Sequence, residues 1–60
     1  METIKETDIN YVRNYIEYRI NRNLPLEATV IESELISKLG QPLWYVRKVL
    51  KVLNVYLNRA

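Results

Sequence analysis

The chain has 60 residues, a formal net charge of +2 at pH 7, and neither cysteine nor histidine. These counts exclude disulfide bonds, a zinc site built from those ligands and imidazole catalysis, and we expect no enzyme, metal or cofactor. A chain of this length forms one domain, residues 1–60, with a small core that gains stability from oligomerisation. The sequence shows neither a signal peptide nor an apolar run long enough for a membrane span, so we expect a cytoplasmic protein.

The first predicted helix covers about residues 4–21. Thr3 and Glu6 form a Thr-x-x-Glu pattern that is typical of a helix capping box, and Thr7 is a competing cap. Four aliphatic residues share one face, which we expect to pack on the rest of the domain. They are Ile9, Val12, Ile16 and Ile20.

A second stripe on the same helix consists of Tyr11, Tyr15 and Tyr18. One small core cannot bury both stripes. One interpretation is half-exposed tyrosines whose hydroxyls lie in water. Another is a homodimer interface, since rigid aromatic residues are typical interface anchors. Base stacking is a third interpretation, which the acidic residues of this helix disfavour.

Residues 21–27 contain asparagine and proline and show no periodicity, so the first helix ends there. The β-branched residues at 28–31 then favour a short strand. The alternative is a helix with a capping box formed by Thr29 and Glu32. With the strand, the second helix covers about residues 33–39. Its buried face consists of Leu35, Ile36 and Leu39.

A three-residue corner separates this helix from the next. Gly40 suits the positive φ that ends a helix, and Pro42 suits the start of the following one. Gln41 is kept out of the helical region by the proline after it. Two short amphipathic helices around such a corner form a helix-turn-helix, whose recognition helix covers about residues 42–53.

The recognition helix separates its side chains by face. Its core face consists of Val46, Val49, Leu50 and Leu53. The opposite face carries Trp44, Arg47, Lys48 and Lys51. A solvated lysine face is the ordinary interpretation of such a pattern. An exposed tryptophan directly after the corner instead favours a surface that enters the DNA major groove.

Charge is divided between the two ends of the sequence. All seven acidic residues lie in the first 34 residues, whose net charge is −3, whereas residues 35–60 carry five cations and no acid. Basic side chains on phosphates supply non-specific DNA affinity and make it salt-dependent. Five cations allow few such contacts, so useful affinity implies a homodimer or a neighbouring partner on the DNA.

The segment after Leu53 has two interpretations. Residues 54–58 favour a second short strand that pairs with the first, and the alternative is a frayed end of the recognition helix. No glycine and no basic hairpin follow Leu53 within the sequence.

Residues 30–56 resemble the winged helix-turn-helix domains of GntR-type and related transcription regulators. The resemblance lies in Glu-Leu-x-x-x-Leu-Gly, the corner, and Val-Arg-x-x-Leu-x-x-Leu. The family's recurring glycine and core positions correspond to Gly40, Val46, Leu50 and Leu53. The resemblance implies a mainly α fold, a three-helix helix-turn-helix core with two very short strands. In this chain we expect the wing to be reduced or absent.

The same resemblance implies DNA contacts at Pro42, Leu43, Trp44 and Tyr45, followed by Arg47 and Lys48. Family members usually carry small polar or arginine residues at the tip of this helix, where base edges are read. Here the tip is Pro-Leu-Trp-Tyr. Leu43 and Trp44 suit either apolar contact with thymine methyl groups or sugars, or insertion into a pocket of a protein partner.

Two functions follow from these patterns. The first is a small DNA-binding protein, a homodimeric transcription regulator or accessory factor that inserts the 42–53 helix into the major groove of double-stranded DNA. The predicted contact residues are Gln41, Leu43, Trp44, Tyr45, Arg47, Lys48 and Lys51. The alternative is a protein-protein interaction module on the same scaffold, anchored by Leu43, Trp44 and Tyr45. A membrane-surface helix is disfavoured, because the core needs the aliphatic face.

Overall fold

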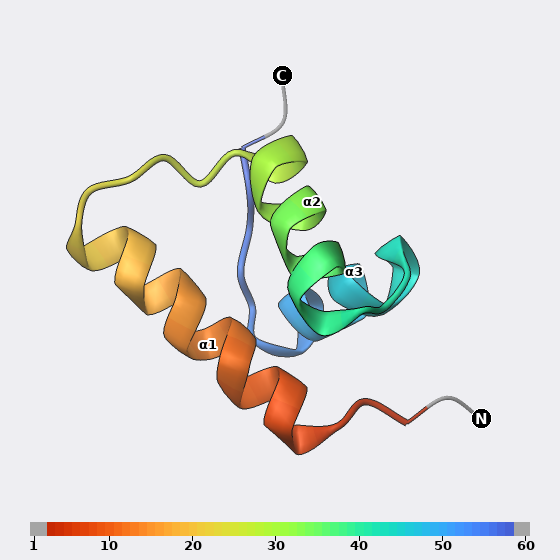
Figure 1. Ribbon diagram of the computed structural model, residues 1–60. Coiled ribbons are helices and arrows are strands. Elements are labelled where there is room, and N and C mark those ends of the chain that lie inside the picture. Colours follow the sequence, from red (N-terminus) through yellow and green to blue (C-terminus); the bar gives the residue numbers. More distant parts are fainter. Residues whose placement is uncertain (1–2, 59–60) are drawn as a thin grey trace.

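The computed structural model describes residues 3–58 of the chain. It consists of the helices α1 (Glu6–Asn21), α2 (Ala28–Leu39) and α3 (Leu43–Val52), followed by a C-terminal segment. This segment returns from the end of α3 to the start of α2 (Figure 1). The predicted mainly α fold with a three-helix core is confirmed.

Side chains from all three helices form one hydrophobic core. Its buried members are Val12, Ile16, Ile31, Leu35, Tyr45, Val46, Val49 and Leu50. The predicted core face of α3 therefore lies in the core, with Leu53 packed at its edge. The same holds for α2, where Leu35 is buried and Ile36 and Leu39 are partly buried against it.

The prediction for α1 is right for three residues and wrong for Ile20. Val12 and Ile16 are buried and Ile9 is partly buried, but the side chain of Ile20 is 53% exposed. Ile20 lies in the last turn of α1, which extends past α2 and α3 (Figure 1).

The predicted strand over residues 28–31 is wrong, because α2 begins at Ala28 and not near residue 33. As a helix, this segment places Ala28 and Ile31 on the same face as Leu35, and all three are buried. Burial of that face outweighs the modest strand preference of β-branched residues. The alternative capping box is wrong too, since the N-cap is Glu27 and no side chain caps the helix.

The backbone of the C-terminal segment caps α2 instead. The amide of Ala28 donates to the carbonyl oxygen of Asn58 at 2.9 Å, and the amide of Asn58 donates to the carbonyl oxygen of Leu26 at 2.8 Å. Within residues 3–58 this contact is an isolated parallel bridge between Glu27 and Asn58, and the two expected strands are absent. The segment therefore satisfies one of the free amides at the start of α2.

The corner between α2 and α3 has the predicted conformation. Gly40 ends α2 in the left-handed region with φ +64°, and its amide donates to the carbonyl oxygen of Ile36 at 2.9 Å. α3 begins at Leu43, one residue later than expected, so Pro42 is its N-cap and not its first helical residue. Asn54, with φ +57°, then turns the chain after α3.

The predicted capping box of α1 is wrong. The N-cap is Lys5, and no side chain caps the helix. The start of α1 is instead held by Tyr45 of α3, whose hydroxyl bonds with Lys5 and Asp8 as described below. This contact joins elements that are far apart in the sequence.

Candidate nucleic-acid interface

The outer face of α3, formed by Trp44, Arg47, Lys48 and Lys51, points away from the core. All four residues are exposed, and the Trp44 residue retains 46% of its accessible surface. Its indole meets the Tyr45 ring edge-to-face, with 5.8 Å between ring centroids. The indole therefore rests against the protein on one side and reaches solvent on the other.

Tyr45 was predicted as a contact residue, and the structure contradicts this. Its side chain lies in the core and the residue is only 4% exposed. Its hydroxyl donates to Oδ2 of Asp8 at 2.6 Å and accepts a hydrogen bond from the amide of Lys5 at 3.0 Å. Tyr45 thus joins α3 to the first turn of α1.

This environment also changes the acidity of Tyr45. Burial raises the pKa of the phenol above its ordinary value of 10.0, and the hydrogen bond to Asp8 and the charge of Asp8 act in the same direction. The hydrogen bond from the Lys5 amide lowers the pKa and offsets part of this rise. The neutral phenol is the form that fits the site.

Arg47 combines an exposed position with a buried partner. Its Nε donates to Oε2 of Glu32 on α2 at 3.1 Å. The Glu32 side chain is 8% exposed and the Arg47 side chain 52%. The carboxylate therefore holds the inner part of the arginine while the outer part reaches water.

The other predicted contact residues lie around this face. Leu43, at the start of α3, is 38% exposed, and Gln41 is half-buried in the corner. Lys48 and Lys51 are exposed one and two turns after the helix start. Of the seven predicted residues, five are exposed, Gln41 is half-buried and Tyr45 lies in the core.

A shallow groove of about 470 Å³ lies beside this face, between α3 and the C-terminal segment. Its lining residues are Glu32, Arg47, Leu50, Lys51, Asn54, Val55, Tyr56 and Leu57. Tyr56 is 84% exposed and was missed as a site residue from the sequence. Val55 and Leu57 pack on the core side, and side chains alternate between the two sides of an extended segment. The position of Tyr56 between two aliphatic residues is the sequence signal that would have indicated its exposure.

The tyrosine stripe of α1 is partly exposed. Tyr11 and Tyr18 are exposed, whereas Tyr15 is partly buried against the core. The guanidinium of Arg22 lies 4.8 Å from the ring centroid of Tyr18, and that of Arg19 lies 5.8 Å from the centroid of Tyr15. Two of the three aromatic rings therefore remain available at the surface.

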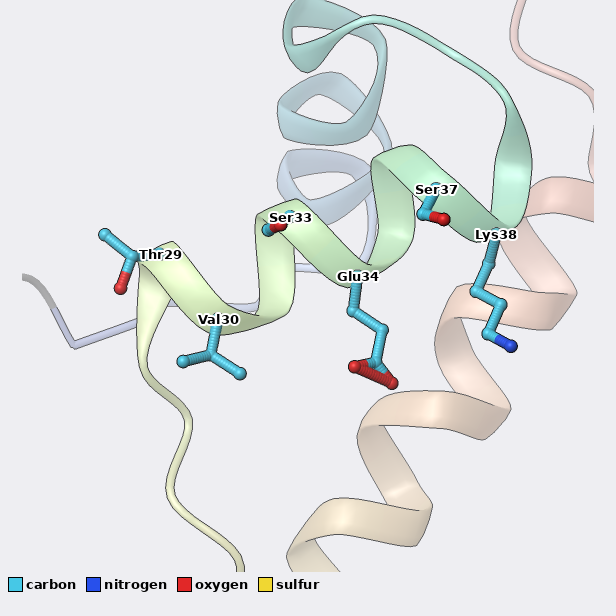
Figure 2. A pocket seen from close by; sticks show the side chains of 6 residues that line it. All are labelled: Thr29, Val30, Ser33, Glu34, Ser37 and Lys38. Atoms are coloured by element: carbon cyan, nitrogen blue, oxygen red, sulfur yellow. The ribbon is translucent and has the colours of Figure 1, made fainter.

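A second hollow follows the outer side of α2. Figure 2 shows its six lining residues, which all belong to this helix and run along it: Thr29, Val30, Ser33, Glu34, Ser37 and Lys38. The hollow is open to solvent and takes no side chain from another element. It lies apart from the outer face of α3, and it is not part of the candidate site.

Comparison with protein-family models, with curated proteins and with solved structures gave no match in any of the three cases. Among the helices of residues 3–58, none is long and apolar enough to cross a bilayer. In the same part of the chain, no three acidic, histidine or cysteine side chains are grouped so as to hold a metal ion.

Proposed function

We propose that this chain is a small cytoplasmic DNA-binding protein of the winged helix-turn-helix type, acting as a transcription regulator or accessory factor. In this proposal α3 enters the major groove of double-stranded DNA. The observation that carries it is the exposed Trp44 indole beside Lys48 and Lys51, directly after the corner at Gly40. A helix in this position is the one that such motifs present to DNA.

The chemistry of the face suits the DNA backbone better than base edges. Arg47, Lys48 and Lys51 are cations that bind phosphates, whereas Trp44 and Leu43 supply apolar contact to sugars or thymine methyl groups. Gln41 is the one polar amide at the entrance to the helix. Tyr45 takes no part, because it belongs to the core.

The test uses Trp44, the single tryptophan of the chain, as a fluorescent probe. Duplex DNA is titrated against its emission at two salt concentrations. Three phosphate contacts predict a slope of log affinity against log salt of about −2.7, or a loss of roughly 40-fold between 50 and 200 mM. An unchanged emission, with no salt-sensitive binding by an independent assay, contradicts the proposal.

Charge reversal provides the matched control. The double variant Lys48→Glu/Lys51→Glu should lose duplex binding. Arg13→Glu/Lys38→Glu changes the net charge equally at exposed positions on α1 and α2 and should retain most of it. Equal losses in both variants would mean that overall charge, and not the α3 face, drives binding.

We also propose that two copies pair through α1. Tyr11 and Tyr18 are exposed on one face, and an antiparallel pair related by two-fold symmetry would place each beside the other in the partner. The same arrangement brings the acidic first turn of each α1, with Glu6 and Asp8, to the end that carries Arg19 in the partner. Two α3 helices in one dimer would read half-sites about one DNA turn apart.

The oligomeric state tests this pairing. Tyr18→Glu should convert a dimer into a monomer in light scattering after gel filtration. Ile20→Glu is the control, because Ile20 is equally exposed on the same helix but lies on its other side. A wild-type chain that is monomeric at high micromolar concentration contradicts the pairing.

A protein-interaction module is the second candidate function. It is favoured by the exposure of Leu43 and Trp44 together, and by the pairing of Arg47 with a carboxylate. For such a module Trp44→Ala should be the severe change, and reversal of the two lysines should weaken a partner complex only modestly. For DNA binding, reversal of the two lysines should be the severe change and Trp44→Ala the milder one.

A further inference from the structure

We infer that the groove between α3 and the C-terminal segment holds one sugar-phosphate strand of the bound duplex, and that Tyr56 contacts this strand. The inference deepens the proposed function and rests on it. It gives a role in binding to the residues after α3, where the sequence predicts a wing that is reduced or absent. The C-terminal segment lies beside α3 and exposes the side chain of Tyr56 to solvent.

The position of Tyr56 is set by the backbone on both sides of it. Before it, the amide of Val55 donates to the carbonyl oxygen of Leu50 at 3.0 Å, and after it, Asn58 pairs with Leu26 and Ala28. Val55 and Leu57 pack against the core, so alternation along the extended chain directs Tyr56 outward. Its ring is held at the surface by a segment that is fixed at two points.

The exposure of Tyr56 is unusual for an aromatic residue in so small a chain. At 84% it is the most exposed large hydrophobic residue of the described part, well above Trp44. Burial does not explain its position, since its neighbours Val55 and Leu57 supply the packing of this segment. An aromatic ring that ends in a hydroxyl suits a sugar face and a phosphate oxygen.

The charge of the groove selects an anionic occupant. Arg47 and Lys51 form the α3 wall, and both also belong to the outer face of the helix. Glu32 is the only acidic residue among those that line the groove, and its buried carboxylate is engaged by Arg47. The groove thus extends the basic surface of α3 toward Tyr56. With α3 in the major groove, a sugar-phosphate strand at the edge of that groove would meet such a surface.

The experiment compares Tyr56→Ala with Ile20→Ala, which truncates an exposed apolar side chain on α1. Tyr56→Ala should weaken duplex binding about fivefold, the loss of one hydrogen bond with its contact. The salt slope should stay unchanged, because the phenol carries no charge. Lys51→Ala, by contrast, should reduce the slope by about one. In phosphate-ethylation interference, modification of one flanking phosphate should weaken binding of the wild-type chain. This interference should be absent for Tyr56→Ala and present for Ile20→Ala.

The outcomes separate this inference from the proposed function. If the wild-type chain binds duplex DNA and Tyr56→Ala matches it in affinity and interference pattern, the groove assignment is wrong and the function of α3 stands. If the wild-type chain binds no duplex, both are overturned. Far-UV circular dichroism checks folding, and a misfolded Tyr56→Ala is replaced by Tyr56→Phe, which should lose the same interference contact.

Discussion

Arg47 of α3 donates a hydrogen bond from Nε to the buried Oε2 of Glu32 on α2, so one ion pair joins the two helices of the helix-turn-helix. The partners lie 15 residues apart in the sequence. Only the arginine reaches water to a large extent. If the carboxylate is neutralised, Arg47 remains in water, and the cost is the loss of a charge-assisted hydrogen bond between the two helices.

Glu32→Gln should therefore destabilise the domain. The amide keeps the size of the side chain but removes the charge opposite Arg47, and we expect the free energy of unfolding to fall by about 1–2 kcal/mol. Urea unfolding followed by circular dichroism at 222 nm measures it. Glu34→Gln, exposed on the same helix, is the control. Equal midpoints for the two variants would mean that the pair is not stabilising.

Tyr45→Phe tests the contact between α1 and α3. Loss of the hydroxyl leaves the Asp8 carboxylate and the Lys5 amide without this partner, and a hydrogen bond to a charged group contributes about 1–2 kcal/mol. The same urea experiment should show a loss of this size. Tyr56→Phe removes an exposed hydroxyl and should leave stability unchanged. A neutral result for Tyr45→Phe would argue against the contact.

The raised pKa of Tyr45 predicts a loss of stability in alkali. A pKa that is higher in the folded chain than in the unfolded one adds stability below the unfolded value of about 10, and this is lost as the pH rises through the folded pKa. Between pH 9 and 12 the wild-type chain should therefore lose stability faster than Tyr45→Phe. Parallel curves for the two proteins would contradict the shift.

Gly40→Ala should destabilise the corner through backbone conformation alone. A Cβ atom at this position meets nothing within 4 Å, but φ is +64°. For most L-residues the left-handed conformation costs about 1 kcal/mol of free energy, and the cost is lower for asparagine. Thermal unfolding should thus rank the wild type above Gly40→Asn, and Gly40→Asn above Gly40→Ala. If alanine is no worse than asparagine, conformational cost does not set the stability of the corner.

Asn58→Pro tests the cap that the C-terminal segment provides for α2. Proline has no amide to donate to Leu26, so the segment should detach and the Ala28 amide should lose its acceptor. Hydrogen exchange of the Ala28 amide should become faster in Asn58→Pro and stay slow in Asn58→Ala. Similar exchange rates in both variants would show that the segment does not protect α2.

The parts of the fold that local chemistry determines could be predicted from the sequence. Gly40 and Pro42 define the corner within three residues, and the faces of α3 follow from helical spacing. The strand at residues 28–31 was wrong because Ala28 and Ile31 fit a buried helix face together with Leu35, and only packing in the folded chain decides between strand and helix. A late start for α2 also left Glu32 at a helix terminus, where its pairing with Arg47 could not be foreseen.

Tyr45 shows the same limit within the site. On a helical wheel it lies at the border between the core and the outer face of α3, so spacing alone does not assign it. Its partner Asp8 is 37 residues away, and no local pattern connects them. Trp44, next to it, lies clearly on the outer face and was assigned correctly.

The half-exposed indole of Trp44 makes the chain's intrinsic emission a reporter of its surroundings and not of its interior. Denaturation moves this ring from one wet environment to another, so its emission maximum should shift little while the helices melt. A large blue shift on mixing with a ligand would then signal that water has been displaced from the ring, without any rearrangement of the packed centre.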